Sequence, residues 1–414
     1  MGTSGAGDGA GEIRVLVDNG EYALRNRGDL ALMAMTVERL RERWSRARIG
    51  MLTDEPHLLR AVLPQAEPIP AGGGGHWGRS GFIGQLDQLA GARVTGPAVR
   101  RWRHVTDAPL GTLREVRARV RTEVLARTGS APEVAGMPPL PPVPAAVAES
   151  SLVIAQGGQY LADADRYQAH RTLNLLEHAQ RLGIPTAMLG QGLGPMRDPE
   201  LLRRAAEVLP GVDFIGVRDR LFGPPLLAEL GVPAERVLVT GDDAVEFGYR
   251  LRRPEIGGEL GLCATVSGAA RTALDAAVRV STLGPVRPID NRAGTAESLA
   301  RCVARCRVLV TGAFHPAVFA LSQGIPAVAV TASRHYDDKF SGLADMFGTG
   351  LRVVHLDAED LESGLANAVR ELWEAAPELR DTLQQRAVEQ IDDARTGLER
   401  VCQLVRVRSA SRSN

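Results

Sequence analysis

The chain has 414 residues, of which 44% are hydrophobic, and a formal net charge of +0. This length exceeds one ordinary core and predicts two domains of roughly 150 to 200 residues each. The balanced charge gives no overall positive potential that would attract nucleic acid or an anionic membrane surface. No apolar run approaches the length of a membrane span. We therefore expect a globular protein without a nucleic-acid partner and without a membrane span.

The N-terminal stretch lacks both the positive segment and the apolar segment of a signal peptide. We expect residues 1–11 to be disordered and the protein to be cytoplasmic. The chain contains four cysteines, and Cys302 and Cys306 stand at helical spacing with no second ligand pair nearby. This usage predicts buried thiols rather than disulfides or a zinc site. We therefore expect no metal and no resident cofactor.

From residue 13 onward, short apolar runs alternate with amphipathic stretches, which is typical of β-α-β units on parallel sheets. The predicted strands of the first set are 13–20, 47–54, 151–158, 185–192, 213–219 and 236–243. Helices are expected between them, for example over 29–45, 168–182 and 219–230. A helical insert and a proline-rich connector, too stiff for a helix or central strand, interrupt the pattern over 93–147. Residues 12–245 are thus predicted to form an N-terminal Rossmann-like domain.

The alternation restarts after a stretch near 244–257 that contains proline and glycine. The second set of predicted strands is 260–268, 286–290, 307–312, 326–332 and 351–356. Residues 257–376 are predicted to form a C-terminal Rossmann-like domain, followed by one long helix over 377–406. We expect this helix to pack across the domains, although it could serve a homodimer instead. The fold class is α/β with two doubly wound domains, and such domains bind ligands in the cleft at the carboxyl ends of their strands.

Glycine turns follow several of the predicted strands. In the first, Asn26 and Asp29 flank Gly28 at the start of a helix, and helix capping alone would explain Asp29. The turns at 155–163 and 190–198 would expose backbone N–H groups at a helix start, which suits an anion. These turns are candidate binding sites.

Charged residues stand at other strand ends. Arg218 ends an apolar strand, so it is either bridged to Asp219 or Asp242 or aimed at an anionic ligand. Helix capping is the favoured role for at least one of Asp242 and Asp243. Of the 49 basic residues 48 are arginines, and the single lysine is Lys339. A compact ammonium can do what a planar guanidinium cannot, but chance retention explains one lysine equally well.

His315 follows a predicted strand that ends in Thr311 and Gly312. Pro316 suits the first turn of a helix because it lacks the N–H that would be unsatisfied there. His315 is therefore expected at a helix N-terminus, where the positive end of the helix dipole lowers its pKa and favours a bound anion. The sequence predicts an anion pocket that contains a titratable group.

In their order and spacing these residues resemble the polysaccharide pyruvyl transferase family. The matching motifs are an N-x-G-D turn (Asn26, Gly28, Asp29), a GGG-like turn (Gly157, Gly158, Gln159), a GQGIGP-like turn (190–195), I-x-V-R-D (215–219), a TPD-like end (240–242) and an S-R-L-H-x-x-x-x-A-x-x-x-G-x-P block (TGAFHPAVFALSQGIP, 311–326). The resemblance runs roughly from 13 to 350. It implies a GT-B-like fold, with two Rossmann-like domains and an interdomain cleft.

The resemblance also implies a transferase that moves a pyruvyl group from phosphoenolpyruvate, its co-substrate, to hydroxyls of a saccharide or glycosylated metabolite. His315 would be the catalytic acid or base, and Asp29 would face the acceptor as the second catalytic residue. The implied donor-binding residues are Arg218, Lys339, Thr311, Gly312 and Arg334. The implied acceptor-binding residues are Asn26, Gly28, Gly158, Gln159, Gln191 and Gly192.

One position departs from the family pattern. Where the family has an arginine two residues before the histidine, this chain has Ala313. A charge-assisted hydrogen bond from such an arginine is worth about 1.5 to 3 kcal/mol, so Arg334 or Arg218 would have to replace it. Three alternatives stay open: another anionic donor in specialised metabolism, a GT-B glycosyltransferase using a nucleotide sugar, and a binding protein without catalysis.

Overall fold

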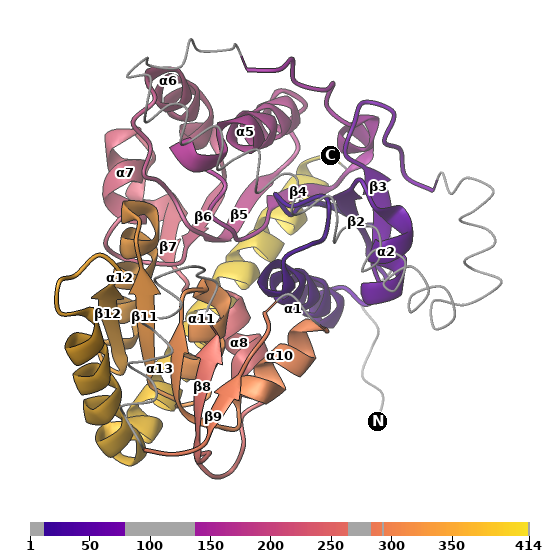
Figure 1. Cartoon of the computed structure of the whole chain (residues 1–414). Coiled ribbons are helices and arrows are strands. Elements are labelled where there is room, and N and C mark those ends of the chain that lie inside the picture. The colour runs from indigo at the N-terminus through magenta and orange to yellow at the C-terminus, as the bar shows by residue number, and fades with distance from the viewer. Residues whose placement is uncertain (1–11, 79–136, 264–282, 292–293, 413–414) are drawn as a thin grey trace, which may run out of the picture.

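The computed structural model describes residues 12–78, 137–263, 283–291 and 294–412. Within them lie two parallel sheets with helices on their faces (Figure 1). The seven-stranded sheet has the order β3-β2-β1-β4-β5-β6-β7. Its strands are β1 (Arg14–Asp18), β2 (Arg48–Thr53), β3 (Glu67–Pro70), β4 (Leu152–Ala155), β5 (Thr186–Gln191), β6 (Phe214–Val217) and β7 (Val237–Val239). The predicted α/β class with parallel sheets is confirmed.

The second sheet has five strands in the order β12-β11-β10-β8-β9. They are β8 (Glu259–Cys263), β9 (Val286–Pro288), β10 (Cys306–Thr311), β11 (Ala327–Thr331) and β12 (Leu351–His355). The helices in chain order are α1 (Arg27–Arg43), α2 (Pro56–Val62), α5 (Arg166–Arg181), α6 (Pro199–Val208), α7 (Gly223–Glu229), α8 (Ala244–Arg250), α10 (Ala296–Val303), α11 (Phe314–Ser322), α12 (Arg334–Phe347) and α13 (Leu361–Arg412). Short 3-10 turns occupy Ala145–Glu149, Asp163–Asp165, Leu209–Gly211 and Ala234–Arg236.

Strand β1 illustrates why the central strands are almost purely apolar. Val15 and Val17 pack with Met33 of α1 on one face of the sheet. Leu16 packs with Leu175 of α5 on the opposite face. Because helices cover both faces, successive residues are all buried, and the strand lacks the alternation of a half-exposed sheet. The same burial makes these strands easy to predict from the sequence.

Strand β3 was missing from the prediction. Its sequence, Glu67 to Pro70, contains two prolines, which lack the N–H that a central strand must donate. The strand lies at the edge of the sheet, where it pairs only with β2. An edge strand tolerates this loss because its outer side needs no donor to a neighbouring strand. The local sequence therefore argues against a strand, although the position at the edge allows one.

Helix α13 begins at Leu361 rather than 377 and runs to Arg412, with Pro377 inside it. It contacts β5, β6 and β7 of the first sheet and β10, β11 and β12 of the second, crossing behind both sheets in Figure 1. The predicted domain limits remain a prediction. Three predictions lie outside the described residues: the disorder of 1–11, the helical part of the insert, and the end of the strand 260–268.

A buried group of charges joins α1 to α8 below the cleft. Arg39 of α1 forms ion pairs with Asp243 and with Glu246, the latter at 2.7 Å, and all three side chains are at most 6% exposed. Glu246 also accepts hydrogen bonds from Arg250 and from Arg395 of α13. Burial raises the pKa of Glu246, but the arginines outweigh it and lower that pKa to about 2. The carboxylate therefore stays ionised and links three helices.

Candidate functional site

A cavity of about 910 Å³ opens between the two sheets. The strand order of the first sheet reverses between β1 and β4, and that of the second between β8 and β10. Loops that follow β1, β4 and β10 line the cavity, as expected for ligand sites at such reversals. Its lining residues are Asn19, Gly20, Glu21, Leu24, Arg25, Asn26, Arg27, Gly28, Asp29, Leu58, Gly158, Gln159, Tyr160, Asp165, Arg218, Asn291, Leu299, Gly312, Ala313, Phe314, His315, Pro316, Tyr336 and Lys339.

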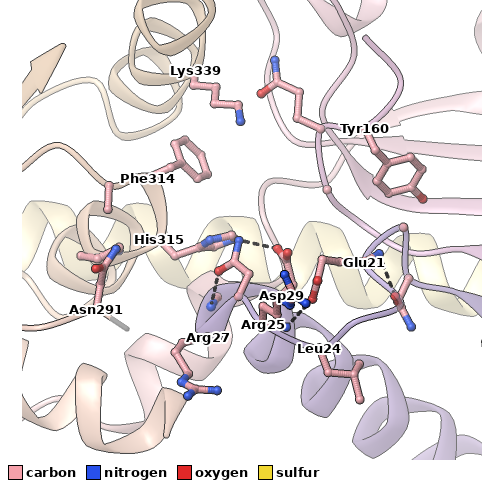
Figure 2. Close-up of a pocket in the computed structure, with 18 of the residues that line it drawn as sticks. Glu21, Leu24, Arg25, Arg27, Asp29, Tyr160, Asn291, Phe314, His315 and Lys339 are labelled. Carbon is pink, nitrogen blue, oxygen red and sulfur yellow. Dashed lines mark hydrogen bonds and ion pairs between the residues drawn. The ribbon is translucent and has the colours of Figure 1, made fainter. Parts of the chain in front are cut away.

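The N-terminus of α1 presents Asp29 to this cavity. Asn26 is the N-cap of the helix, and its side chain accepts a hydrogen bond from the Gly28 backbone N–H at 2.9 Å. Asp29 lies in the first turn and is not the cap. Asn26 therefore caps the helix, and the carboxylate of Asp29 faces the cavity (Figure 2).

His315 approaches the same point from the second sheet. Strand β10 ends at Thr311, whose hydroxyl oxygen accepts from the Ala313 N–H at 2.9 Å and shapes the turn into α11. His315 lies in the first turn of α11, as the sequence predicted. Its Nε2 is 3.9 Å from Oδ1 of Asp29, and this nitrogen is buried without a hydrogen-bond partner among the described residues. Figure 2 shows the two side chains facing each other.

Gly28 permits this approach. A Cβ atom at position 28 would lie 1.9 Å from Nδ1 and 2.0 Å from Cγ of His315. Real side chains never come so close, so any other residue here would displace either the imidazole or the start of α1. The glycine of the N-x-G-D turn is therefore explained by contact between its backbone and the histidine ring.

Two cations, Arg218 and Lys339, also line the cavity. Arg218, after β6, lies 3.8 Å from Asp242, and its guanidinium stands 4.4 Å over the ring of Phe314. Of the two aspartates that the sequence offered as partners, Asp242 forms the ion pair, while the carboxylate of Asp219 accepts the Phe222 N–H at 2.7 Å. Lys339 of α12 extends into the cavity with Nζ 5.1 Å from the centre of the Tyr336 ring (Figure 2).

Asp242 supports the start of α8. Its Oδ1 accepts the Ala244 N–H at 2.9 Å. The neighbouring Asp243 instead pairs with Arg39. The sequence analysis favoured capping for at least one of these two aspartates. Asp243 is the N-cap residue of α8 but makes no side-chain cap hydrogen bond, and Asp242, one residue earlier, accepts the first-turn N–H instead.

Burial and mutual proximity shift the pKa values of the facing groups. Burial, with Glu21 acting in the same direction, raises the pKa of Asp29 to about 7. Burial and the charge of Arg218 lower the pKa of Lys339 to about 7. Burial, Arg218 and Lys339 lower the pKa of His315 to about 3. Near neutral pH the site therefore holds a neutral imidazole between two groups that are each about half titrated, an arrangement suited to proton transfer.

The structure brings most of the predicted site residues together. Beyond Asp29, His315, Arg218 and Lys339, the cavity is lined by Asn26, Gly28, Gly158, Gln159 and Gly312. Three others are not lining residues: Thr311 shapes the turn before α11, the Gln191 side chain donates to the Gly158 carbonyl at 3.5 Å, and the Gly192 N–H donates to the same carbonyl at 2.7 Å. Arg334 is exposed at the start of α12 and is not a lining residue either.

The sequence analysis did not identify several residues of the cavity. Glu21 directly follows the predicted strand 13–20, so the rule that ligands bind at strand ends could have indicated it. Phe314 and Tyr336 lie in the first turns of α11 and α12, but nothing local separates them from core aromatics. Asn291, Arg25 and Arg27 enter the lining only through tertiary packing.

No group of three or more His, Cys, Asp or Glu side chains is arranged to hold a metal ion in the part of the chain that the structure describes. Over the same residues, no helix combines the length and apolarity needed to cross a membrane.

The model of the family described as polysaccharide pyruvyl transferase matches residues 26–334, a span that contains Asp29, Arg218 and His315 but not Lys339. This chain belongs to the polysaccharide pyruvyl transferase family. The resemblance noted in the sequence is thereby confirmed. No curated protein sequence matches the chain.

Solved structures show the fold of this pyruvyl transferase family member. The UDP-GlcNAc 2-epimerase from Neisseria meningitidis, bound to UDP-GlcNAc, is 10% identical and matches 95% of this chain and 99% of its own with a TM-score of 0.51. The glycotransferase of kitacinnamycin is 14% identical, with 94% and 99% covered and a TM-score of 0.49. At such identity the likeness shows the fold alone, and the predicted GT-B-like fold is confirmed.

Proposed function

We propose that this protein transfers a pyruvyl group from phosphoenolpyruvate to hydroxyls of a saccharide or glycosylated small molecule. The observation that carries the proposal is the pair Asp29 and His315, 3.9 Å apart, in a cavity that Arg218 and Lys339 also line. Addition of a hydroxyl to an enol phosphate needs an acid for the enol carbon, a base for the hydroxyl and cations for phosphate and carboxylate. The cleft offers each kind of group, and family membership points to the same reaction.

The proposed roles follow from the position of each group in the cavity and from the pKa of Asp29. Arg218 and Lys339 bind the phosphate and carboxylate of the donor. Asp29, whose pKa is about 7, gives its proton to the enol CH₂ carbon, while His315 takes the proton of the attacking hydroxyl at the adjacent carbon. His315 is the weaker base of the pair, so it returns that proton to Asp29. Attack by a second hydroxyl then displaces phosphate, which leaves with the proton of that hydroxyl as inorganic phosphate, and a cyclic ketal remains.

The donor decides between this proposal and a nucleotide-sugar transferase. Because Lys339 is the only lysine of the sequence, its labelling by an amine-reactive reagent, followed by peptide mass spectrometry, reports on its occupancy. We expect phosphoenolpyruvate, but not UDP-glucose, to protect Lys339 and to raise the melting temperature. With a suitable acceptor, inorganic phosphate is released. Protection by UDP-glucose alone, with no phosphate release, would contradict the proposal.

Donor affinity is expected to fall as the pH rises from 7 to 9. Above its pKa of about 7 Lys339 loses its positive charge, and Asp29 gains a negative one, so both changes oppose binding of an anion. The loss should be about tenfold, the effect of one charge-assisted contact. Titration calorimetry with phosphoenolpyruvate at each pH measures it.

The variant Lys339→Arg keeps its charge over this range and should remove the part of the decline that Lys339 causes. The exposed Arg334→Ala, outside the cavity lining, serves as the control and should retain the decline of the wild type. An equally steep decline in Lys339→Arg would show that Lys339 does not bind the donor.

The variant Gly28→Ala should lower the rate of phosphate release by about a hundredfold, the cost of displacing a reacting group by about 1 Å. Its new Cβ would overlap the His315 ring. The matched control is Gly364→Ala in α13, where the added Cβ meets only Oδ2 of Asp360, at 3.8 Å. Rates of both variants, with their melting temperatures, separate a misplaced histidine from unfolding. Full activity in Gly28→Ala would mean that the position of His315 does not matter.

A further inference from the structure

The guanidinium of Arg218 is held on several sides at once. Its Nη2 donates a hydrogen bond to Oε1 of Gln159. Its Cζ lies 4.4 Å from the centre of the Phe314 ring. A Cβ on Gly192 would come within 2.6 Å of the same Cζ, so the glycine backbone lies directly against the guanidinium. We refer to Gln159, Phe314 and Gly192 as the Arg218 seat.

The members of the seat are themselves oriented by further contacts. Nε2 of Gln159 donates to the Gly194 carbonyl at 2.7 Å, and this bond turns the amide so that its oxygen faces Arg218. The Phe314 ring lies edge-on to His315, with ring centres 5.6 Å apart, and 6.1 Å from the ring of Phe340. The seat therefore ties the position of Arg218 to that of His315.

The seat restrains Arg218 without neutralising it. Gln159 is an uncharged acceptor, and the ring of Phe314 attracts a cation without carrying a charge. The carboxylate of Asp242, at 3.8 Å, lies beyond hydrogen-bond distance. Arg218 is 7% exposed, and the carboxylates of Asp242, Asp219 and Asp29 stabilise its charge less than burial opposes it, which leaves a positive field for an anionic ligand.

We propose that Gln159 and Phe314 are positioning residues that hold Arg218 as the carboxylate- or phosphate-binding group of the donor site. This inference rests on the proposed function and makes it more specific. It answers the question raised by Ala313, because a restrained Arg218 supplies anion binding where the first turn of α11 supplies none. Gln159, which the family resemblance assigned to acceptor binding, would then act on the donor site by positioning Arg218.

Binding measured in two backgrounds tests the proposal. Gln159→Leu and Phe314→Leu are titrated with phosphoenolpyruvate and with inorganic phosphate, each alone and combined with Arg218→Met. Each alone should weaken binding about tenfold, the size of one hydrogen bond to a charge or one buried cation–π contact. Combined with Arg218→Met, neither should weaken it further, because both act through Arg218. Phe314→Tyr keeps the ring and should bind like the wild type. Equal losses in both backgrounds would overturn the proposal.

A measurement without ligand separates this inference from the proposed function. In nitrogen-15-labelled protein, the guanidinium signals of Arg218 are those that vanish in Arg218→Met. We expect slow rotation of this group in the wild type and faster rotation in Gln159→Leu and Phe314→Leu. Equal rotation in all three would show that no seat exists. Slow rotation in a wild type that does not bind phosphoenolpyruvate would contradict the proposed donor and leave the seat in place.

Discussion

Asp29→Asn should lower the rate of phosphate release by about a hundredfold to ten-thousandfold, the usual contribution of a general acid. The amide has the shape of the carboxyl group but cannot give up a proton to the donor. At pH 6, where Asp29 with its pKa of about 7 is mostly uncharged, the variant should bind phosphoenolpyruvate as the wild type does. Rate and affinity measured at that pH separate a lost proton donor from a lost binding site.

The pH dependence gives a second check on Asp29. At saturating phosphoenolpyruvate, where the titration of Lys339 no longer limits binding, the wild-type rate should fall above pH 7 as Asp29 loses its proton. This fall should be absent from the residual rate of Asp29→Asn. The matched control is Asp165→Asn, which removes another carboxylate of the cavity and keeps a good N-cap for α5. We expect its rate to remain within about threefold of the wild type, as for a residue without a chemical role. A similar loss in both variants would assign the effect to cavity charge instead.

Arg39→Met should lower the free energy of unfolding by about 3 to 5 kcal/mol, the cost of breaking a buried ion pair by removing one partner. Glu246 keeps Arg250 and Arg395, but the carboxylate of Asp243, 3% exposed, loses its ion-pair partner. Urea unfolding followed by circular dichroism measures the change. The loss should come from the contact between α1 and α8, which Arg39 joins through Asp243 and Glu246.

The control for Arg39 is Arg181→Met, which breaks a pair with Glu177 in which the arginine side chain is 71% exposed. Exposed pairs of this kind contribute less than about 1 kcal/mol because water and salt screen them. Equal unfolding free energies of Arg39→Met and the wild type would show that apolar packing alone holds α1 against α8.

The sequence predicted the parallel strands and the turns after them because these features depend on near neighbours. Residues 15–17 are apolar without alternation since helices cover both faces of the sheet, and this composition is visible in any buried strand. His315 at a helix start was likewise predictable from the strand, the glycine and Pro316 beside it. The ordered motifs indicated the family, which the comparison with the family model confirms.

The sequence could not predict which groups face one another. Asp29 and His315 meet because α1 and α11, from opposite sides of the cleft, direct their first turns to one point. The pKa values of about 7 for Asp29 and Lys339 arise from burial by residues far away in the chain. Local sequence likewise misjudged β3, whose prolines are tolerated only because it lies at an edge.

By itself, then, the sequence determined the fold class, the family and the strand ends that carry chemical groups, because each depends on local pattern and order along the chain. Only the tertiary structure decided that Asn26 rather than Asp29 caps α1 and that Gln159 contacts Arg218. It alone also showed that the ring of His315 occupies the place where a side chain at position 28 would lie. The physical reason is that desolvation, close approach and hydrogen bonding depend on distances in space, which are set only once both sheets and the long helix α13 have packed together.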